Sequence, residues 1–550
     1  MLYGILFVGS GGNFMWYDER VFYQIYPLGF CDALDPNADK GVNRLKKISD
    51  WLDYFNKLAI GAIIFNPIFQ SSNHGYDTVD FLRIDERLGN NQDFKGLVTK
   101  FHACDIKVIL DGVFNHVGRE FWAFKDVREN GQNSQYCNWF LIDFNGNSNY
   151  NDGFYYQGWE GHYELVELNL ANQEVVNYLL GVVEKWISEF DIDGIRLDVA
   201  YSLNEDFLRQ LKSKVYSIKK DFFLLGEIIH GDYRRIMNDE MLNSVTNYQA
   251  YKGMWSSFNS YNFFEIAHTF NEHFVNSYPN NNTLLFVDNH DVTRCASILN
   301  NPNHLKLIYA LLLTAKGIPC LYYGSEWKAE GLKKDGDEGL RKSYNEPLYN
   351  DFTAFISKLI RIRNKYSALQ YGDYKQIFLT NKQYIYSRSD SKQTLYFAAN
   401  MADTSYYGNC NLEGSYYDLI SDKKIICHNG FELESYQAYL LVADTDIDPE
   451  DEVIDQLKLA RDNINRIDQE MGLLFTKRME EVEAVIKYKL LHNLPILDSN
   501  RENEVIERNV ANLKSKKYEI YYIEYIKMLM GISKKYQAEI LNKSKEKKKI

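Results

Sequence analysis

The chain has 550 residues, a formal net charge of −13 and 45% apolar residues, the composition of a globular protein too long for one hydrophobic core. The acidic balance argues against nucleic acid as the main partner, and the lack of any apolar run of about 18 residues argues against a membrane span. Seven scattered cysteines, an odd number without a CxxC pair, indicate a reducing, cytoplasmic setting.

The first fifteen residues contain one short apolar run without a basic stretch, so we do not expect a signal peptide. Gly11 and Gly12 stand just before Met15, as a translated ribosome-binding site would. Met1 and Met15 therefore both stay open as the true start.

Between residues 16 and 368, short apolar runs alternate with amphipathic patterns. The runs are VFYQIYP (21–27), AIIFNPIF (62–69), KVILDGVFN (107–115), GIRLDVA (194–200), FFLLGEII (222–229), SVTNYQAY (244–251), TLLFVDNHD (283–291) and GIPCLYYG (317–324). Segments between them place apolar residues at three- and four-residue steps, as helices do; examples are 45–58, 174–190, 205–218 and 304–315. Eight strands alternating with helices predict an α/β fold closed as a (β/α)8 TIM barrel.

Three further segments are expected around and after this barrel. Residues 117–170, rich in Asn, Gly, Tyr and Trp, exceed what a strand-to-strand crossover needs and predict an irregular inserted subdomain. Residues 369–443 contain strand-like runs split by turn residues, which predict a small β-sandwich. An acidic linker (444–455) and an all-helical domain (456–541) follow.

Polar residues gather where the barrel strands end, which is the edge that carries the chemistry in TIM barrels. They are Asp111, Asn115 and His116 after the third strand, Arg196 and Asp198 after the fourth, Glu227 after the fifth, and Asp288, Asn289, His290 and Asp291 after the seventh. Carboxylates that converge at one mouth shift one another's pKa values. Such a cleft suits a reaction that needs one ionised and one protonated carboxyl, such as splitting a glycosidic bond.

These segments carry a family resemblance. DGVFNH (111–116), GIRLDVA, GEIIH (226–230) and FVDNHD (286–291) resemble the four signature segments of the α-amylase family of glycoside hydrolases, and HGYDTVDF (74–81) and ELN (167–169) resemble two more. The form SNHGYDT (72–78) is similar to the neopullulanase, cyclomaltodextrinase and maltogenic amylase branch. The resemblance spans residues 20–370 and implies a retaining mechanism on α-glucan oligosaccharides.

The resemblance implies roles for single residues. Asp198 is expected to be the nucleophile, Glu227 the general acid and then base, and Asp291 the carboxylate that grips the sugar's secondary hydroxyls. Substrate contacts are expected from Tyr76, Asp111, His116, Arg196, His290, Asp337 and Arg341. The Lys-His pair that often follows the nucleophile segment in classical α-amylases is absent, and Ala200-Tyr201-Ser202 stand there. The calcium site of those enzymes uses that His, so we predict no calcium. Because carboxylates carry the chemistry, we also predict no other metal and no cofactor.

The helical tail has a coiled-coil-like seam that predicts a partner helix. Its members are Leu457, Ala460, Ile464, Ile467, Met471 and Leu474. Arg478 and Lys489, eleven residues apart, share one helix face. Residues 453–541 resemble the all-helical chorismate mutase family, and every functional position has a match: Arg461, Arg478, Lys489, Asp498, Arg501, Glu502, Ser533 and Gln537.

In that family Arg461 reaches in from the partner subunit, which implies a homodimer through these helices. The cations suit a bound dianion, and Lys489 and Gln537 suit the breaking ether oxygen. The sequence thus predicts a fused α-glucan hydrolase and chorismate mutase. Two alternatives stay open: a helical tail that only dimerises or senses aromatic metabolites, and a barrel that transfers glucosyl units instead of hydrolysing.

Overall fold

The computed structural model describes residues 15–280, 282–446, 456–492, 494–495, 499–513 and 515–547. The chain divides into two compact units, residues 1–447 and 448–550, which are described separately. Within the described ranges, no helix combines the length and the apolar character that crossing a membrane requires.

The first unit is built on a parallel barrel whose eight strands all lie within the predicted runs. They are β1 (Phe22–Ile25), β2 (Ala62–Phe65), β5 (Lys107–Gly112), β11 (Gly194–Leu197), β12 (Phe223–Gly226), β13 (Ser244–Val245), β14 (Leu284–Leu285) and β15 (Ile318–Tyr322). Their order is β13-β12-β11-β5-β2-β1-β15-β14, and a bridge between Thr246 and Leu284 nearly closes the ring. The predicted (β/α)8 fold is confirmed.

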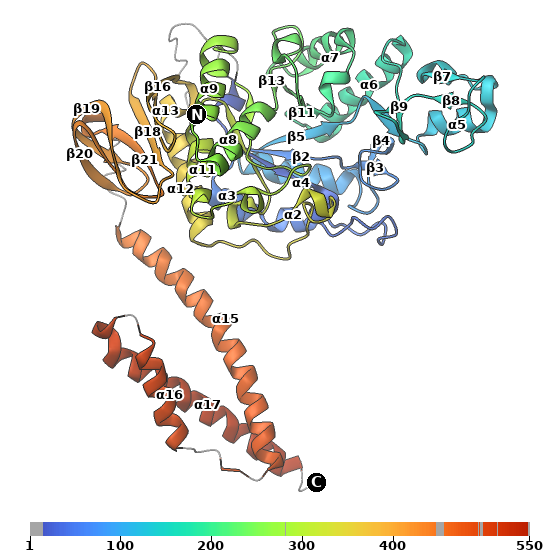
Figure 1. Ribbon diagram of the computed structural model, residues 1–550. Coiled ribbons are helices and arrows are strands. Elements are labelled where there is room, and N and C mark those ends of the chain that lie inside the picture. Colours follow the sequence, from blue (N-terminus) through green and yellow to red (C-terminus); the bar gives the residue numbers. More distant parts are fainter. Residues whose placement is uncertain are drawn as a thin grey trace, which may run out of the picture. The chain divides into compact units, whose positions relative to one another are not determined.

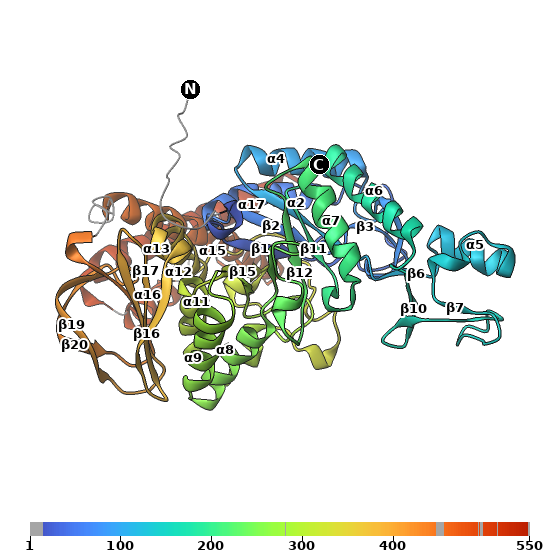
Figure 2. The same ribbon diagram turned by 90° about the horizontal axis from the view of Figure 1, so that it is seen from above.

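Helices surround the strands (Figures 1 and 2). α6 (Gln173–Phe190) and α7 (Glu205–Ile218) match their predicted patterns, and the side chains of Asn172 and Asn204 cap the first amides of these helices. α11 (His304–Thr314) precedes β15 in the chain, α12 (Asp351–Lys365) follows it, and the two helices contact each other. The single helix predicted over 45–58 is instead α2 (Lys46–Asp50) and α3 (Leu52–Leu58), because Trp51 leaves helical geometry between them.

Two details of the prediction are wrong for local reasons. The sixth apolar run does not continue as a strand to residue 251, because the Asn247 side chain accepts from the Ala250 amide and starts α8 (Tyr248–Ser260). The inserted segment is more ordered than expected. It contains α5 (Trp122–Asn130) and a three-stranded sheet of β6 (His116–Gly118), β10 (His162–Glu167) and β9 (Gly158–Trp159).

A six-stranded antiparallel sheet follows the barrel, in the order β16-β17-β18-β21-β19-β20. The strands are β16 (Asp373–Leu379), β17 (Gln383–Ser389), β18 (Thr394–Asn400), β19 (Tyr406–Asp418), β20 (Lys423–Leu433) and β21 (Gln437–Ala443). The long β19–β20 ribbon folds back over the first strands, since the Phe378 and Tyr406 rings lie 6.0 Å apart. This sheet and the insert lie at opposite sides of the barrel in both views (Figures 1 and 2).

The second unit is helical, as predicted. α15 (Gln456–Leu491) runs 36 residues, α16 covers Ser499–Ala511, and α17 covers Glu519–Lys547. Val482 and Ile486 of α15 and Ile526 of α17 are its buried apolar side chains among the residues described. The N-terminal residues 1–14 and most of the predicted linker, 447–455, lie outside the described residues.

Candidate active sites

One arginine joins the carboxylates at the mouth of the barrel. Arg196 Nη1 donates to both carboxylate oxygens of Asp111, at 2.8 and 2.7 Å, and to Asp198 Oδ1 at 2.9 Å. Its Nη2 lies 2.7 Å from Glu227 Oε1. Asp198 and Glu227 are only 6% and 4% exposed. Three neighbouring strands therefore bring three buried carboxyls to one guanidinium. Asp198, the predicted nucleophile, binds its Nη1, and Glu227, the predicted acid, lies beside its Nη2.

The Glu227 carboxyl is also fixed from its other side. The Val199 amide donates to Glu227 Oε2 at 3.1 Å, and the Tyr248 hydroxyl donates to Oε1 at 3.3 Å. Val199 has a φ of +40°, a left-handed conformation that a β-branched residue rarely adopts. Backbone strain of this kind is typically stored where geometry serves a site. The bend directs the amide that follows Asp198 onto Glu227.

The pKa values of the carboxyls in this cluster are shifted in different directions. Burial raises the pKa of Asp198 well above its usual range, and the Arg196 guanidinium opposes that shift. Burial likewise raises the pKa of Asp111 against the same cation. Burial would also raise the pKa of Asp291, but His290 and Arg341 hold it well below its usual range. Asp291 is therefore held ionised, whereas the ionised form of Asp198 depends on the Arg196 guanidinium beside it.

A second group of predicted residues surrounds Asp291. Its oxygens lie 2.9 Å from His290 Nε2 and 2.9 Å from Arg341 Nη2, and Arg341 Nη2 also lies 2.9 Å from Asp337 Oδ2. The Tyr76 ring stacks on His290 with centroids 5.8 Å apart, and its hydroxyl bonds the same imidazole. The structure thus brings together the residues that the sequence analysis expects to contact the sugar on this side.

His116 stands between the two groups. Its Nε2 lies 4.0 Å from Asp198 Oδ2 and has no hydrogen-bond partner among the described residues. Burial lowers the pKa of His116 to about 3, so the ring is neutral at ordinary pH. A neutral imidazole can donate one hydrogen bond to a hydroxyl without adding charge to the cluster.

Several side chains that the sequence analysis did not single out complete the cluster. Asn66 Nδ2 donates to Asp111 Oδ2 at 3.2 Å, and Gln24 Nε2 bonds Asn66 at 3.0 Å and His290 Nδ1 at 3.2 Å. Tyr248 follows β13 and contacts Glu227. All three lie in or just after barrel strands, so the signal that identified Asp111 and Asp198 would also have found them.

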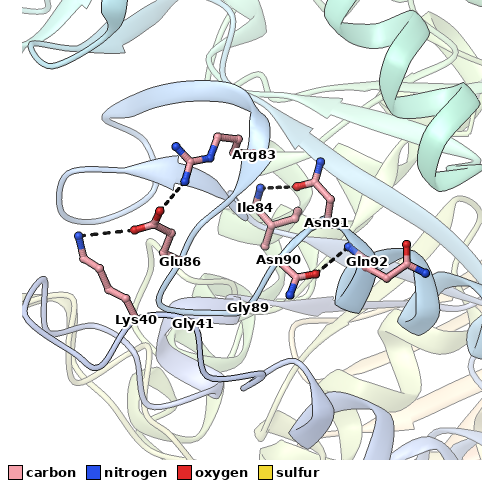
Figure 3. Close-up of a pocket in the computed structure, with 9 residues that line it drawn as sticks. All are labelled: Lys40, Gly41, Arg83, Ile84, Glu86, Gly89, Asn90, Asn91 and Gln92. Carbon is pink, nitrogen blue, oxygen red and sulfur yellow. Dashed lines mark hydrogen bonds and ion pairs between the residues drawn. The ribbon is translucent and has the colours of Figure 1, made fainter.

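A surface hollow of about 630 Å³ lies elsewhere, beside β4 (Thr78–Ile84) and the start of α4 (Asn91–Ala103) (Figure 3). Lys40, Arg83 and Glu86 line it, and Glu86 pairs with both cations. It contains none of the predicted site residues. Within the described ranges, no three His, Cys, Asp or Glu side chains are grouped in a way that could hold a metal ion.

The helical unit assembles part of its own predicted site. Arg478 of α15 donates to the Ser533 hydroxyl of α17. Gln537, one turn further along α17, is buried, and its Oε1 has no hydrogen-bond partner within the described part of the chain. Lys534 Nζ lies 2.8 Å from Glu502 Oε1 of α16. α15 and α17 therefore form a polar region that contains a guanidinium and an unpartnered amide oxygen, and a separate ion pair joins α17 to α16.

The other predicted residues of this unit are less informative. Arg501 is exposed and pairs with Glu504 at 2.8 Å, and Lys489 is half-buried on α15. Arg461 falls on α15, but its side chain lies outside the described residues, as does all of Asp498. The structure therefore joins Arg478 with Ser533 near Gln537, while the positions of the remaining contacts stay predictions.

Family models match two separate parts of the chain. "Alpha amylase, catalytic domain" matches residues 24–348, and "Chorismate mutase type II" matches residues 460–538.

Individual relatives agree with the first match. A cyclomaltodextrinase of Geobacillus thermopakistaniensis is 32% identical over 430 residues, covering 70% of this chain and 70% of the relative. An intracellular maltogenic amylase of Bacillus subtilis is 34% identical over 382 residues, covering 64% and 63%. A solved structure of a cyclomaltodextrinase superposes with a TM-score of 0.72 at 27% identity, covering 78% of each chain.

Proposed function

Because the chain belongs to the α-amylase family of glycoside hydrolases and carries a chorismate mutase type II domain, we propose that it is a bifunctional enzyme. Its barrel would hydrolyse α-1,4-glucosidic bonds in maltodextrins, cyclodextrins and starch-type glucans with retention of configuration. Its helical domain would convert chorismate to prephenate. The two activities would use separate units of the chain and separate chemistry.

The observation that carries the first activity is the bonding of Asp198 and Glu227 to one buried guanidinium. Asp198 would attack the anomeric carbon while Glu227 gives its proton to the departing oxygen, which breaks the glycosidic bond and forms a glycosyl ester. Water would then attack the anomeric carbon of that ester while Glu227 takes a proton from the water, which releases the Asp198 carboxylate. Arg196 would favour the ionised form of Asp198, and Asp291, held ionised by Arg341, would grip the sugar hydroxyls.

The substrate class follows from the family and from the donor groups around Asp291. Neutral His116 and the pair of His290 and Tyr76 offer hydrogen-bond donors and a flat ring, which suit a glucose ring with many hydroxyls. The name of the Geobacillus relative indicates that it acts on cyclomaltodextrins. Chain-length preference, α-1,6 cleavage and glucosyl transfer depend on the leaving-group side of the cleft.

The test of the first activity is product analysis with maltodextrin, cyclodextrin and pullulan, followed by proton NMR of the anomer first released. We expect the α-anomer of a short maltooligosaccharide from the first two substrates. The β-anomer would overturn the retaining mechanism, and transfer products without free reducing sugar would favour the transglycosylase alternative.

The second activity is supported by the contact of Arg478 with Ser533 and by the buried Gln537 one turn along α17, whose Oε1 has no hydrogen-bond partner among the described residues. Rearranging chorismate needs no nucleophile. It needs the dianion held in a folded shape and the negative charge on the ether oxygen stabilised. Arg478 suits a carboxylate, and an amide can donate to the ether oxygen at any ordinary pH. Loss of chorismate absorbance with the full-length protein tests this; no rate above background would leave the dimerising or sensing tail.

A homodimer through the helical domain is part of the proposal. Four predicted seam residues have large exposed side chains in the single chain: Ile464, Ile467, Met471 and Leu474, the last 65% exposed. A second copy would cover this apolar stripe. Light scattering that gives a monomer would contradict the dimer and would leave each mutase site without the Arg461 of its partner.

A cytoplasmic location is supported by seven cysteines that are all free thiols.

A further inference from the structure

The insert presents a short rigid hairpin to the mouth of the barrel. β9 and β10 are joined by Glu160 and Gly161, whose φ values of +47° and +87° are those of a tight two-residue turn. On its other edge β10 pairs with β6, where Glu167 lies opposite His116. The hairpin is therefore fixed, through one continuous small sheet, to a residue that contacts the Asp198 carboxyl.

The tip of this hairpin touches the barrel at two places. The Trp159 ring lies 5.7 Å from the His116 ring, and its buried indole N–H has no hydrogen-bond partner among the described residues. Glu160 Oε1 accepts a hydrogen bond of 3.2 Å from the Tyr201 hydroxyl. These contacts connect the insert to the loop that follows Asp198.

Tyr201 is positioned from several directions. Its ring centroid lies 5.5 Å from that of His230 at an angle of 41°, and Arg235 Nη2 donates to the Tyr201 carbonyl at 2.6 Å. Burial and the neighbouring Glu160 carboxylate raise the pKa of Tyr201 far above neutrality, so its hydroxyl stays protonated and keeps its bond to Glu160. The ring remains half-buried, which leaves part of it open to a ligand.

The rings lie on the side of the cleft where the leaving group must depart. Tyr201 follows Asp198 by three residues and His230 follows Glu227 by three, so both stand at the ends of β11 and β12. Under the function proposed above, Glu227 gives its proton to the leaving oxygen, and the leaving sugar lies beside it. The residues expected to bind the other sugar are grouped instead around Asp291.

We infer that Tyr201 is the ring on which the leaving, or accepting, glucose unit stacks, and that Glu160 is the positioning residue that fixes its orientation. The inference rests on the proposed glucan hydrolase. This role of Tyr201 would also set the ratio of hydrolysis to glucosyl transfer. The ester bond to Asp198 breaks as an oxygen of water or of a sugar hydroxyl attacks the anomeric carbon, and Glu227 takes that oxygen's proton. A sugar held on Tyr201 competes with water.

The experiment compares two donors that differ only in the leaving group. α-Maltosyl fluoride loses fluoride and needs no sugar on the Tyr201 side, whereas maltotetraose loses maltose. We expect Tyr201→Ala to lower kcat/KM for maltotetraose about tenfold, chiefly through KM, a change equivalent to about 1.4 kcal/mol. Turnover of the fluoride should stay within about twofold of wild type. With maltose added as acceptor, the transferred share should fall severalfold.

Conservative variants separate stacking from folding. Tyr201→Trp keeps a ring and should restore most of the transfer, and Glu160→Gln keeps an accepting oxygen and should resemble wild type. Glu160→Ala should lose part of the transfer without loss of fluoride turnover. Tyr155→Ala, an exposed ring elsewhere on the insert, is the control that should change neither donor.

Three outcomes overturn the inference, and they are distinguishable. If Tyr201→Ala reduces turnover of both donors equally, the residue only supports the fold, and the proposed hydrolase stands without this subsite. If wild type turns over neither donor, the proposed hydrolase fails and the inference fails with it. An unchanged transferred share in Tyr201→Ala likewise rejects the stacking role.

Discussion

Replacing Arg196 by methionine should expose how much the carboxylate cluster depends on one cation. The substitution keeps a long side chain and removes the partner of Asp111, Asp198 and Glu227. Breaking a buried ion pair by removing one partner costs about 3–5 kcal/mol. For a unit of 447 residues, unfolding entropy is about 0.9 kcal/mol per degree. The unfolding temperature of this unit should therefore fall by about 3–5 °C at pH 7.5.

The pH dependence of that loss follows from the pKa directions. A carboxyl whose pKa is raised on folding destabilises the fold as pH rises from its unfolded to its folded pKa. Burial already raises the pKa values of Asp198 and Asp111, and Arg196 opposes this rise. Without Arg196, the interval between the unfolded and the folded pKa values of Asp198 and Asp111 widens. The calorimetric loss should therefore be large at pH 7.5 and should shrink toward pH 5, where the unpaired carboxyls take up protons.

Two companion variants make this test specific. Adding Asp198→Asn to Arg196→Met should recover part of the lost stability at pH 7.5, because one unpaired charge disappears. Arg363→Met is the control. Arg363 is equally buried but donates to the carbonyls of Leu313, Ala315 and Gly317, so its loss should not depend on pH in this way. Equal losses at both pH values for Arg196→Met would refute the electrostatic reasoning.

Further predictions concern the two activities. Asp198→Asn should abolish glucan hydrolysis, because the nucleophile is lost without a change in volume, while the chorismate assay of the same sample stays at the wild-type rate; comparable hydrolysis would reject the assignment. Glu227→Gln should lose activity on unactivated glucans and keep some on maltosyl fluoride, with azide raising the rate; equal loss on both donors would contradict its role as acid. Arg478→Ala should lower the mutase rate by several orders of magnitude, whereas the wild-type rate should be nearly flat from pH 6 to 8, because Gln537 donates without being protonated. A steep acid limb would point to a carboxyl in place of that amide.

Much of the barrel could be predicted because its signals are local. Each strand is a short apolar run, and Asp111, Asp198 and Glu227 stand at the ends of such runs. The contacts between residues distant in sequence could not be predicted in the same way. Nothing in the local pattern indicates that Glu160 meets Tyr201, because that contact depends on how the insert folds over the barrel.

In the helical domain, too, local features can be predicted from the sequence and contacts between distant residues cannot. Periodicity predicts α15, and the shared face of Arg478 and Lys489 follows from helix geometry. The bond between Arg478 and Ser533 depends on how α17 packs, which a one-dimensional pattern does not contain. The residues at the start of α8 resemble a strand in sequence, but the Asn247 cap makes them begin a helix at Tyr248.

The left-handed Val199 joins the segment after Asp198 to Glu227 at little net cost in stability. Glycine would adopt that backbone freely and would relieve strain of about 1–3 kcal/mol. It would also add about 0.5–1 kcal/mol of chain entropy and remove a side chain that is 4% exposed, whose burial contributes about 1.5–3 kcal/mol. The same freedom would loosen the amide that holds Glu227. A laboratory selection for heat resistance would therefore gain nothing from Val199→Gly, and a selection for glucan digestion would reject it.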